Sequence, residues 1–213
     1  MQPYFFPYAG YFRLFAAADV FVILDTVQFP RRGWVHRNRL PDRKGEAQWL
    51  TVPIAKAARE VLIQDVRLAE GAAGELADDT RRFPLFDAAE VRGHPLVQAM
   101  LRPDAALVPY LTRLLEETCQ TLGISCAVKK ASELADTGDT RAQDRILEIA
   151  AGLRATHYVN ASGGRELYDA AAFARRGIEL RFFDPYQGSD WSILYRLMTE
   201  DPSAVAKEIR SQS

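Results

Sequence analysis

The feature that most constrains the fold is a continuous apolar run, Val20–Leu24 (VFVIL). A short run that is apolar at every position and rich in β-branched residues predicts a strand that is buried on both faces. Strands of this kind belong to parallel sheets that are covered by helices. The run therefore predicts an α/β protein in which this strand lies inside the sheet.

Predicted strands and helices alternate along the rest of the chain. Further strands are expected at 49–52, 61–66, 125–128, 158–160 and 178–183, and helices at 10–18, 95–122, 140–153 and 166–176. This alternation predicts one α/β domain over residues 1–213, with a mostly parallel, Rossmann-like sheet flanked by helices and a helical insertion at 68–122. Parallel sheets bind ligands beyond the carboxyl ends of their strands, so we expect a site in the loops after Leu24, Asn160 and Phe183.

Composition excludes several classes of protein. Lys and Arg number 27 against 28 Asp and Glu, and the net charge of -1 argues against non-specific nucleic-acid binding. No apolar run approaches the ~18 residues of a membrane span, and the N-terminus has no secretory pattern, so we expect a cytoplasmic protein. Cys119 and Cys126 lie in apolar patterns without metal-ligand spacing and are predicted to be structural.

The N-terminal segment is unusual, because seven of its first 15 residues are aromatic. Pro3 and Pro7 exclude a regular helix before Gly10. One interpretation is a rigid turn that leads into a helix N-terminus and binds an anion or a sugar; its candidate residues are Gln2, Tyr4, Gly10 and Tyr11. The other interpretation is a small aromatic core, and the sequence does not choose between the two.

Polar and aromatic side chains are dense between Asp25 and Arg39, directly after the first predicted strand. Asp25 suits the orientation of an amine or hydroxyl or the binding of Mg²⁺, and Gln28 suits an amide or carboxylate. Candidate groups for stacking and for pairing with phosphate or carboxylate are Arg32, Trp34, Arg37, Asn38 and Arg39. The alternative is a solvated basic hairpin with Trp34 and Val35 packed in the core. Residues 1–43 hold six Arg against three Asp, which favours an anionic ligand here.

A third candidate segment follows the strand predicted at 158–160. Its glycines would expose backbone amides as an anion site before a helix, although Ser162 is equally suited to be that helix's N-cap. The candidate binding residues are Asn160, Ser162, Gly163, Gly164, Tyr168 and Asp169.

Over nearly its whole length, the chain resembles the WbqC-like family of bacterial proteins. The resemblance rests on the run from Gln2 to Phe12, on the D-x-V-Q-F and G-W-x-x-R-N-R motifs between Asp25 and Arg39, on Trp49–Pro53, and on residues 162–169. It implies a role in surface polysaccharide biosynthesis of the O-antigen type. The implied reaction is transfer of glycine or another acyl group onto an amino sugar.

The N-terminal region is also similar to pantothenate synthetase and other nucleotidylyltransferase-like folds, at Pro7, Gly10, Tyr11, Ala18–Val20 and Gln28–Phe29. This similarity implies ATP, with Mg²⁺, as the candidate cofactor, bound against the first helix. The histidine pair of those enzymes is absent here.

Two main hypotheses follow. In the first, the chain is an acyl or aminoacyl transferase acting on a nucleotide-linked amino sugar, with Asp25, Gln28 and Arg37 as catalytic residues. In the second, it is a non-catalytic sugar-nucleotide-binding or assembly protein of the same pathway. A third hypothesis is that the chain is a nucleotidyltransferase-like enzyme.

Overall fold

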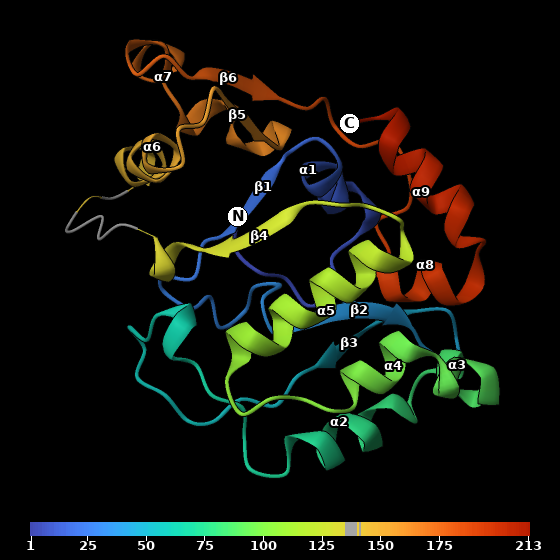
Figure 1. Ribbon diagram of the computed structural model, residues 1–213. Coiled ribbons are helices and arrows are strands. Elements are labelled where there is room, and N and C mark those ends of the chain that lie inside the picture. The colour runs from blue at the N-terminus through green and yellow to red at the C-terminus, as the bar shows by residue number, and fades with distance from the viewer. Residues whose placement is uncertain (135–139, 141) are drawn as a thin grey trace.

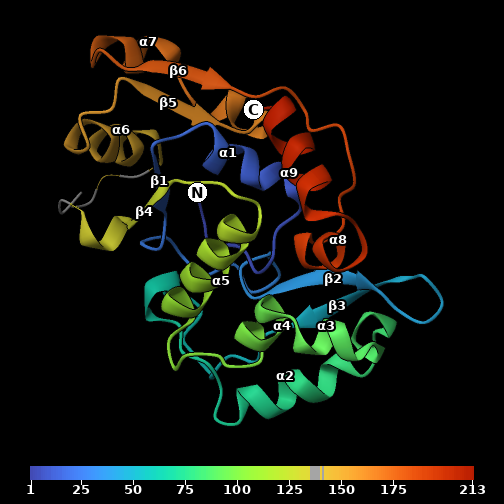
Figure 2. The same ribbon diagram turned by 45° about the vertical axis from the view of Figure 1, so that its right-hand side comes forward.

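The computed structural model describes residues 1–134, 140 and 142–213 and confirms a mixed α/β fold. Its named strands form three two-stranded sheets within the described residues. Two pairs are parallel: β1 (Val20–Ile23) with β4 (Ala127–Lys130), and β5 (His157–Asn160) with β6 (Glu179–Phe182). The third pair is an antiparallel hairpin of β2 (Arg37–Pro41) and β3 (Ala47–Thr51). In both Figure 1 and Figure 2 the parallel strands lie in the order β4, β1, β5, β6.

Helices surround these strands. The α-helices are α1 (Arg13–Ala16), α2 (Ala72–Thr80), α3 (Ala89–Gly93), α4 (Pro95–Met100), α5 (Leu107–Thr121), α6 (Ala142–Gly152), α7 (Ala170–Arg175), α8 (Ile193–Thr199) and α9 (Pro202–Ser211). Short 3-10 helices occupy Ala9–Phe12, Ile63–Asp65, Pro84–Asp87, Ala131–Glu133 and Ser162–Leu167. Figure 2 shows α2, α3 and α4 beside the hairpin, and α6 and α7 beside β5 and β6.

The predicted strand at Val20–Leu24 is present, but it is not buried on both faces. Phe21 and Ile23 are buried, whereas Val20 and Val22 are only half-buried. The prediction was wrong for these two valines because a cavity lies beside them, between β1 and β5.

The aromatic N-terminal segment contributes to the main core. Phe5, Phe6, Phe12 and Phe15 are each at most 2% exposed, and the Phe15 ring stacks on Phe21 with centroids 3.8 Å apart. For these side chains the structure supports the interpretation as a core. Phe6 itself has a φ of 43°, an uncommon left-handed conformation for a bulky residue.

Several predicted elements differ from the structure. The segment 61–66 contains a 3-10 helix in place of a strand, and one isolated bridge joins Leu62 to Gln28. The single helix predicted over 95–122 is two helices, because Pro103 lies in the segment between α4 and α5. Part of the predicted helix at 140–153 lies outside the described residues, and its described part is α6.

The helix predicted at 166–176 begins only at Ala170. Asp169 caps it by accepting a hydrogen bond from the Ala171 amide at 2.9 Å, so Ser162 is not its N-cap. Ser162 lies instead at the start of a 3-10 helix that makes no side-chain cap.

Candidate functional site

The hairpin and the turn before it present a cationic and aromatic surface, which we call the tryptophan–arginine platform: Trp34, Arg37, Arg39 and Trp49. Side chains alternate across a strand, so Arg37 and Arg39 share one face of β2, while Asn38 is buried on the other. The antiparallel register places Arg39 opposite Trp49. Backbone periodicity therefore brings two guanidinium groups and one indole to the same face.

The two indole rings of the platform lie in contact at a tilt of 53°, and a guanidinium group lies over each ring. The Trp34 and Trp49 ring centroids are 5.0 Å apart. The Arg37 Cζ atom lies 4.0 Å from the centroid of Trp49, and the Arg39 Cζ atom lies 5.2 Å from that of Trp34. Trp34 is 38% exposed, so the alternative was wrong to pack it in the core, although Val35 is fully buried as that alternative expected. Trp34 is exposed and Arg37, Arg39 and Trp49 are partly exposed, so a planar or anionic ligand could reach this surface.

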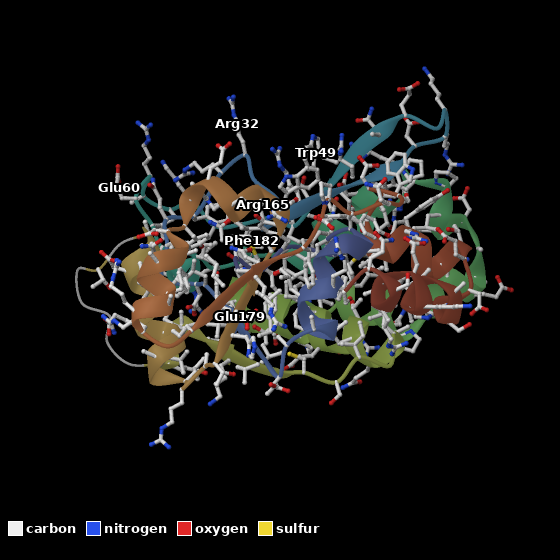
Figure 3. All side chains as sticks on the ribbon, turned by 90° about the horizontal axis from the view of Figure 1, so that it is seen from above. Arg32, Trp49, Glu60, Arg165, Glu179 and Phe182 are labelled. Atoms are coloured by element: carbon white, nitrogen blue, oxygen red, sulfur yellow. The ribbon has the colours of Figure 1, made fainter. Side chains whose placement is uncertain are left out.

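Arg37 is held in place by backbone carbonyls. Its Nη2 donates to the Arg32 oxygen at 2.6 Å and its Nε donates to the Gly33 oxygen at 3.2 Å. The Arg32 side chain is exposed near these groups, and Figure 3 labels both Arg32 and Trp49. At the edge of the platform, the Asp190 carboxylate lies 3.6 Å from Arg39 Nη2, with a side chain that is 83% exposed.

Asn38 positions the N-terminal segment against the hairpin. Its Nδ2 donates to the carbonyl oxygens of Phe5 (3.1 Å) and Phe6 (2.5 Å), and the Ser192 hydroxyl also donates to the Phe6 oxygen at 2.9 Å. These bonds hold the left-handed turn at Phe6. Because Asn38 is buried and its amide is used in this way, the residue acts as a positioning group.

The start of the first helix is covered by aromatic rings. A Cβ atom on Gly10 would overlap the Tyr8 ring and lie 2.7 Å from the Tyr186 ring, so only glycine fits this position. Tyr11 is 3% exposed and donates its hydroxyl to the Gln2 oxygen at 2.7 Å, while Tyr4 is half-buried against it with centroids 5.5 Å apart. This arrangement does not fit ATP phosphates bound against the helix.

Asp25 lies at the carboxyl end of β1, where a parallel sheet places its ligands, but it is 1% exposed. Its two oxygens accept hydrogen bonds from the Ser132 amide at 3.0 Å and the Ser132 hydroxyl at 2.6 Å. The carboxylate therefore fixes the turn that follows β4. Gln28 is exposed and donates from Nε2 to the Arg59 oxygen at 2.9 Å.

The segment after β5 is held by its own contacts. Asn160 Oδ1 accepts from the Ala161 amide at 2.8 Å, and the Tyr168 ring packs on Tyr158 and Phe173. A Cβ atom on Gly164 would lie 3.0 Å from Asn160 Nδ2, whereas Gly163 is exposed.

Next to this segment, Arg165 lies over the Phe182 ring at 5.4 Å, and Figure 3 shows the two labelled side by side. No group of three or more His, Cys, Asp or Glu side chains within the described part of the chain is arranged to hold a metal ion.

Of the residues that the sequence proposed here, the structure brings Trp34, Arg37 and Arg39 together, with only the Arg32 backbone in contact; sequence reasoning did not name Trp49 or Asp190, which lie beside them. The strand predicted at 49–52 carried the signal for Trp49, since pairing it with the R-N-R segment would have set the indole among the arginines. Nothing in the local sequence points to Asp190, because 151 positions separate it from Arg39.

The fold and the site together define a mixed α/β protein that displays indole-stacked guanidinium groups on a hairpin. The chain belongs to the WbqC-like protein family, whose pattern matches residues 2–196. It is 32% identical over 197 residues to a protein of Mycobacterium tuberculosis (strain ATCC 25618 / H37Rv) named "Uncharacterized protein Rv1507c", across 88% of this chain and 81% of that protein. No solved structure gives a significant match. Among the described residues, no helix combines the length and apolar character needed to cross a membrane.

Proposed function

We propose that the chain is an acyl or aminoacyl transferase, glycyl transfer included, which forms an amide on a nucleotide-linked amino sugar in surface polysaccharide biosynthesis. The observation that supports this most is the tryptophan–arginine platform. A nucleotide sugar offers a base for stacking on indole and a diphosphate for pairing with guanidinium groups. Both ligand features match side chains of the hairpin and of the turn that precedes it.

In this proposal Trp34 and Trp49 stack on the base, while Arg37 and Arg39 bind the diphosphate. The contacts that fix Arg37 reduce the entropy lost when it binds an anion. Asp25 is too deeply buried to meet a substrate amine. The carboxylate at the platform is Asp190, and we assign to it the acceptance of the amine proton.

The chemical step balances with a preformed acyl donor. The sugar amine attacks the acyl carbonyl, the carbon–nitrogen bond forms, and the donor's leaving group departs with the bonding electron pair. The amine proton passes to the Asp190 carboxylate. We assign no step to ATP, because the aromatic rings around Gly10 occupy the place where the resemblance would put its phosphates.

The second candidate is a non-catalytic binding protein of the same pathway. It is favoured by the internal hydrogen bonds of Asp25 and Asn38, two polar groups predicted for the site that face neighbouring protein groups instead. This candidate keeps the same platform and the same ligand class but has no product.

The test combines binding with product analysis. Nucleotide-linked amino sugars and a glycyl thioester are incubated with the protein, and amide formation is followed by mass spectrometry. The transferase proposal expects an amide product that Asp190→Asn abolishes while sugar-nucleotide affinity persists. Binding without product across the panel supports the second candidate. If no substrate of the panel binds and no product forms, the transferase proposal and the binding-protein proposal are both contradicted.

A further inference from the structure

None of the chain's three tryptophans belongs to either hydrophobic cluster that the described residues form. Trp34 and Trp49 are the indoles of the tryptophan–arginine platform, and the third, Trp191, is half-buried. Because tryptophan is highly buried on average, three indoles outside the core point to contacts with a ligand. The proposed function uses the first two indoles and leaves Trp191 without a role.

Trp191 adjoins the platform through Arg39. Asp190, which directly precedes Trp191, has its carboxylate 3.6 Å from Arg39 Nη2. The Arg39 Cζ atom lies 5.2 Å from the ring centroid of Trp34 and 5.9 Å from that of Trp49. One guanidinium group therefore lies close to both indoles of the platform and to the residue that precedes the third indole.

The backbone around Trp191 is anchored to the same hairpin. The Ser192 hydroxyl donates to the Phe6 oxygen, which also accepts a hydrogen bond from Asn38 of β2. The Trp191 amide donates to the Ser189 hydroxyl oxygen at 3.3 Å. Figure 1 and Figure 2 both show α8, which begins two residues after Trp191, beside β2. Since these contacts fix the backbone, little of its freedom is lost when a ligand binds.

Trp191 forms a second aromatic pair with Tyr195 of α8. The two ring centroids are 5.9 Å apart and the ring planes are inclined at 54°. Within the part of the chain that the structure describes, neither Trp191 Nε1 nor the Tyr195 hydroxyl has a hydrogen-bond partner, and neither atom is fully buried. Both groups can therefore donate a hydrogen bond to a ligand.

A pair of this kind suits a sugar ring. The C–H face of a pyranose packs on an aromatic ring, and its hydroxyl oxygens accept hydrogen bonds from an indole N–H or a phenol. In a nucleotide sugar the base, the diphosphate and the sugar follow one another along the molecule. The indoles of the platform, its guanidinium groups and the Trp191–Tyr195 pair match these three parts, and Arg39 is close to all but the last.

We propose that Trp191 and Tyr195 form the sugar subsite of the platform and bind the pyranose ring of a nucleotide-linked amino sugar. The ring packs on the Trp191 indole, and sugar hydroxyls accept hydrogen bonds from Trp191 Nε1 and the Tyr195 hydroxyl. The sugar amine then lies beside the Asp190 carboxylate, which adjoins the subsite in the chain. This subsite rests on the proposed function, since the platform holds the rest of the ligand.

The experiment separates the sugar from the nucleotide. Isothermal titration calorimetry gives the Kd of UDP and of UDP-glucosamine for the wild type and for variants; dTDP, GDP and their glucose conjugates extend the panel to other bases. Trp191→Ala should weaken UDP-glucosamine about fivefold or more and leave the Kd of UDP unchanged. Tyr195→Phe removes only a hydroxyl without a protein partner, so it should fold normally and weaken UDP-glucosamine alone, about twofold or more.

Phe182→Ala is the matched control, because the Phe182 ring is also half-buried and outside both hydrophobic clusters but lies against Tyr168 and Arg165. It should leave both Kd values unchanged. The subsite is overturned if Trp191→Ala and Tyr195→Phe weaken UDP and UDP-glucosamine equally, or weaken neither. If no ligand of the panel binds the wild type, the platform and the proposed function fail, and the subsite fails with them.

Discussion

Replacing Asp25 with alanine is expected to destabilise the protein strongly. The buried carboxylate accepts two hydrogen bonds from Ser132 (2.6 and 3.0 Å), and a hydrogen bond to a charged group contributes about 1.5–3 kcal/mol. Loss of both predicts a decrease of about 3–6 kcal/mol in the free energy of unfolding, out of a typical total of about 5–15 kcal/mol. At about 2–4 °C per kcal/mol, Tm falls by about 10 °C. Urea denaturation and calorimetry measure both quantities.

Two matched variants identify the contact that is responsible. Ser132→Ala removes only the hydroxyl bond and is expected to cost about 1–3 kcal/mol. The double variant should cost less than the sum of the two single variants, because the residues share one interaction. The reasoning is refuted if the free energy of unfolding of Asp25→Ala lies within about 1 kcal/mol of the wild-type value, because even one hydrogen bond is expected to contribute about that much. In that case, loss of amide formation in the variant would make Asp25 a group that acts on substrate.

Three further predictions concern stability. Gly10→Ala should cost about 1–3 kcal/mol in urea denaturation, since its Cβ would overlap neighbouring rings, Tyr186 at 2.7 Å among them. For the chain beginning at Met1, the free energy of unfolding should rise from pH 5 to pH 8. The pKa of the N-terminal amine is 8.0 in the unfolded chain and about 5 in the folded one, so over this range the unfolded chain binds the additional proton. N-terminal acetylation removes this amine and should flatten the rise. Arg196 lowers the pKa of Glu208 below 4.5, so the pair's stabilisation should be present above pH 4.5 and fade under acid, and Glu208→Gln should remove that acid sensitivity.

Local pattern was sufficient to predict much of the fold and part of the platform. The apolar run at Val20–Leu24 identified β1. The close spacing of Trp34, Arg37 and Arg39 in the sequence drew attention to this segment, and the alternation along β2 brings both guanidinium groups to one face. Interactions within a few residues determine each of these features.

The features that were missed depend on contacts across long stretches of chain. The partner of Asp25 is 107 positions away, so the sequence did not show that the carboxylate is used internally. The Asn38 bonds to Phe5 and Phe6 likewise span more than 30 positions. The partial burial of Val20 depends on the cavity beside β1, which local hydrophobicity does not report.

The measurement that tests the central claim most directly is the affinity of a nucleotide-linked amino sugar for platform variants, by isothermal titration calorimetry. Base–aromatic stacking contributes about 1–3 kcal/mol, and 1.4 kcal/mol is tenfold in Kd, so Trp49→Ala should weaken binding about tenfold or more. Arg37→Ala should weaken it similarly and make binding less sensitive to salt. Arg43→Ala serves as the control, because Arg43 lies at the far end of the hairpin and pairs with Asp87 at 2.7 Å. The account predicts that this control keeps the wild-type Kd. Equal Kd values for all four proteins would contradict it.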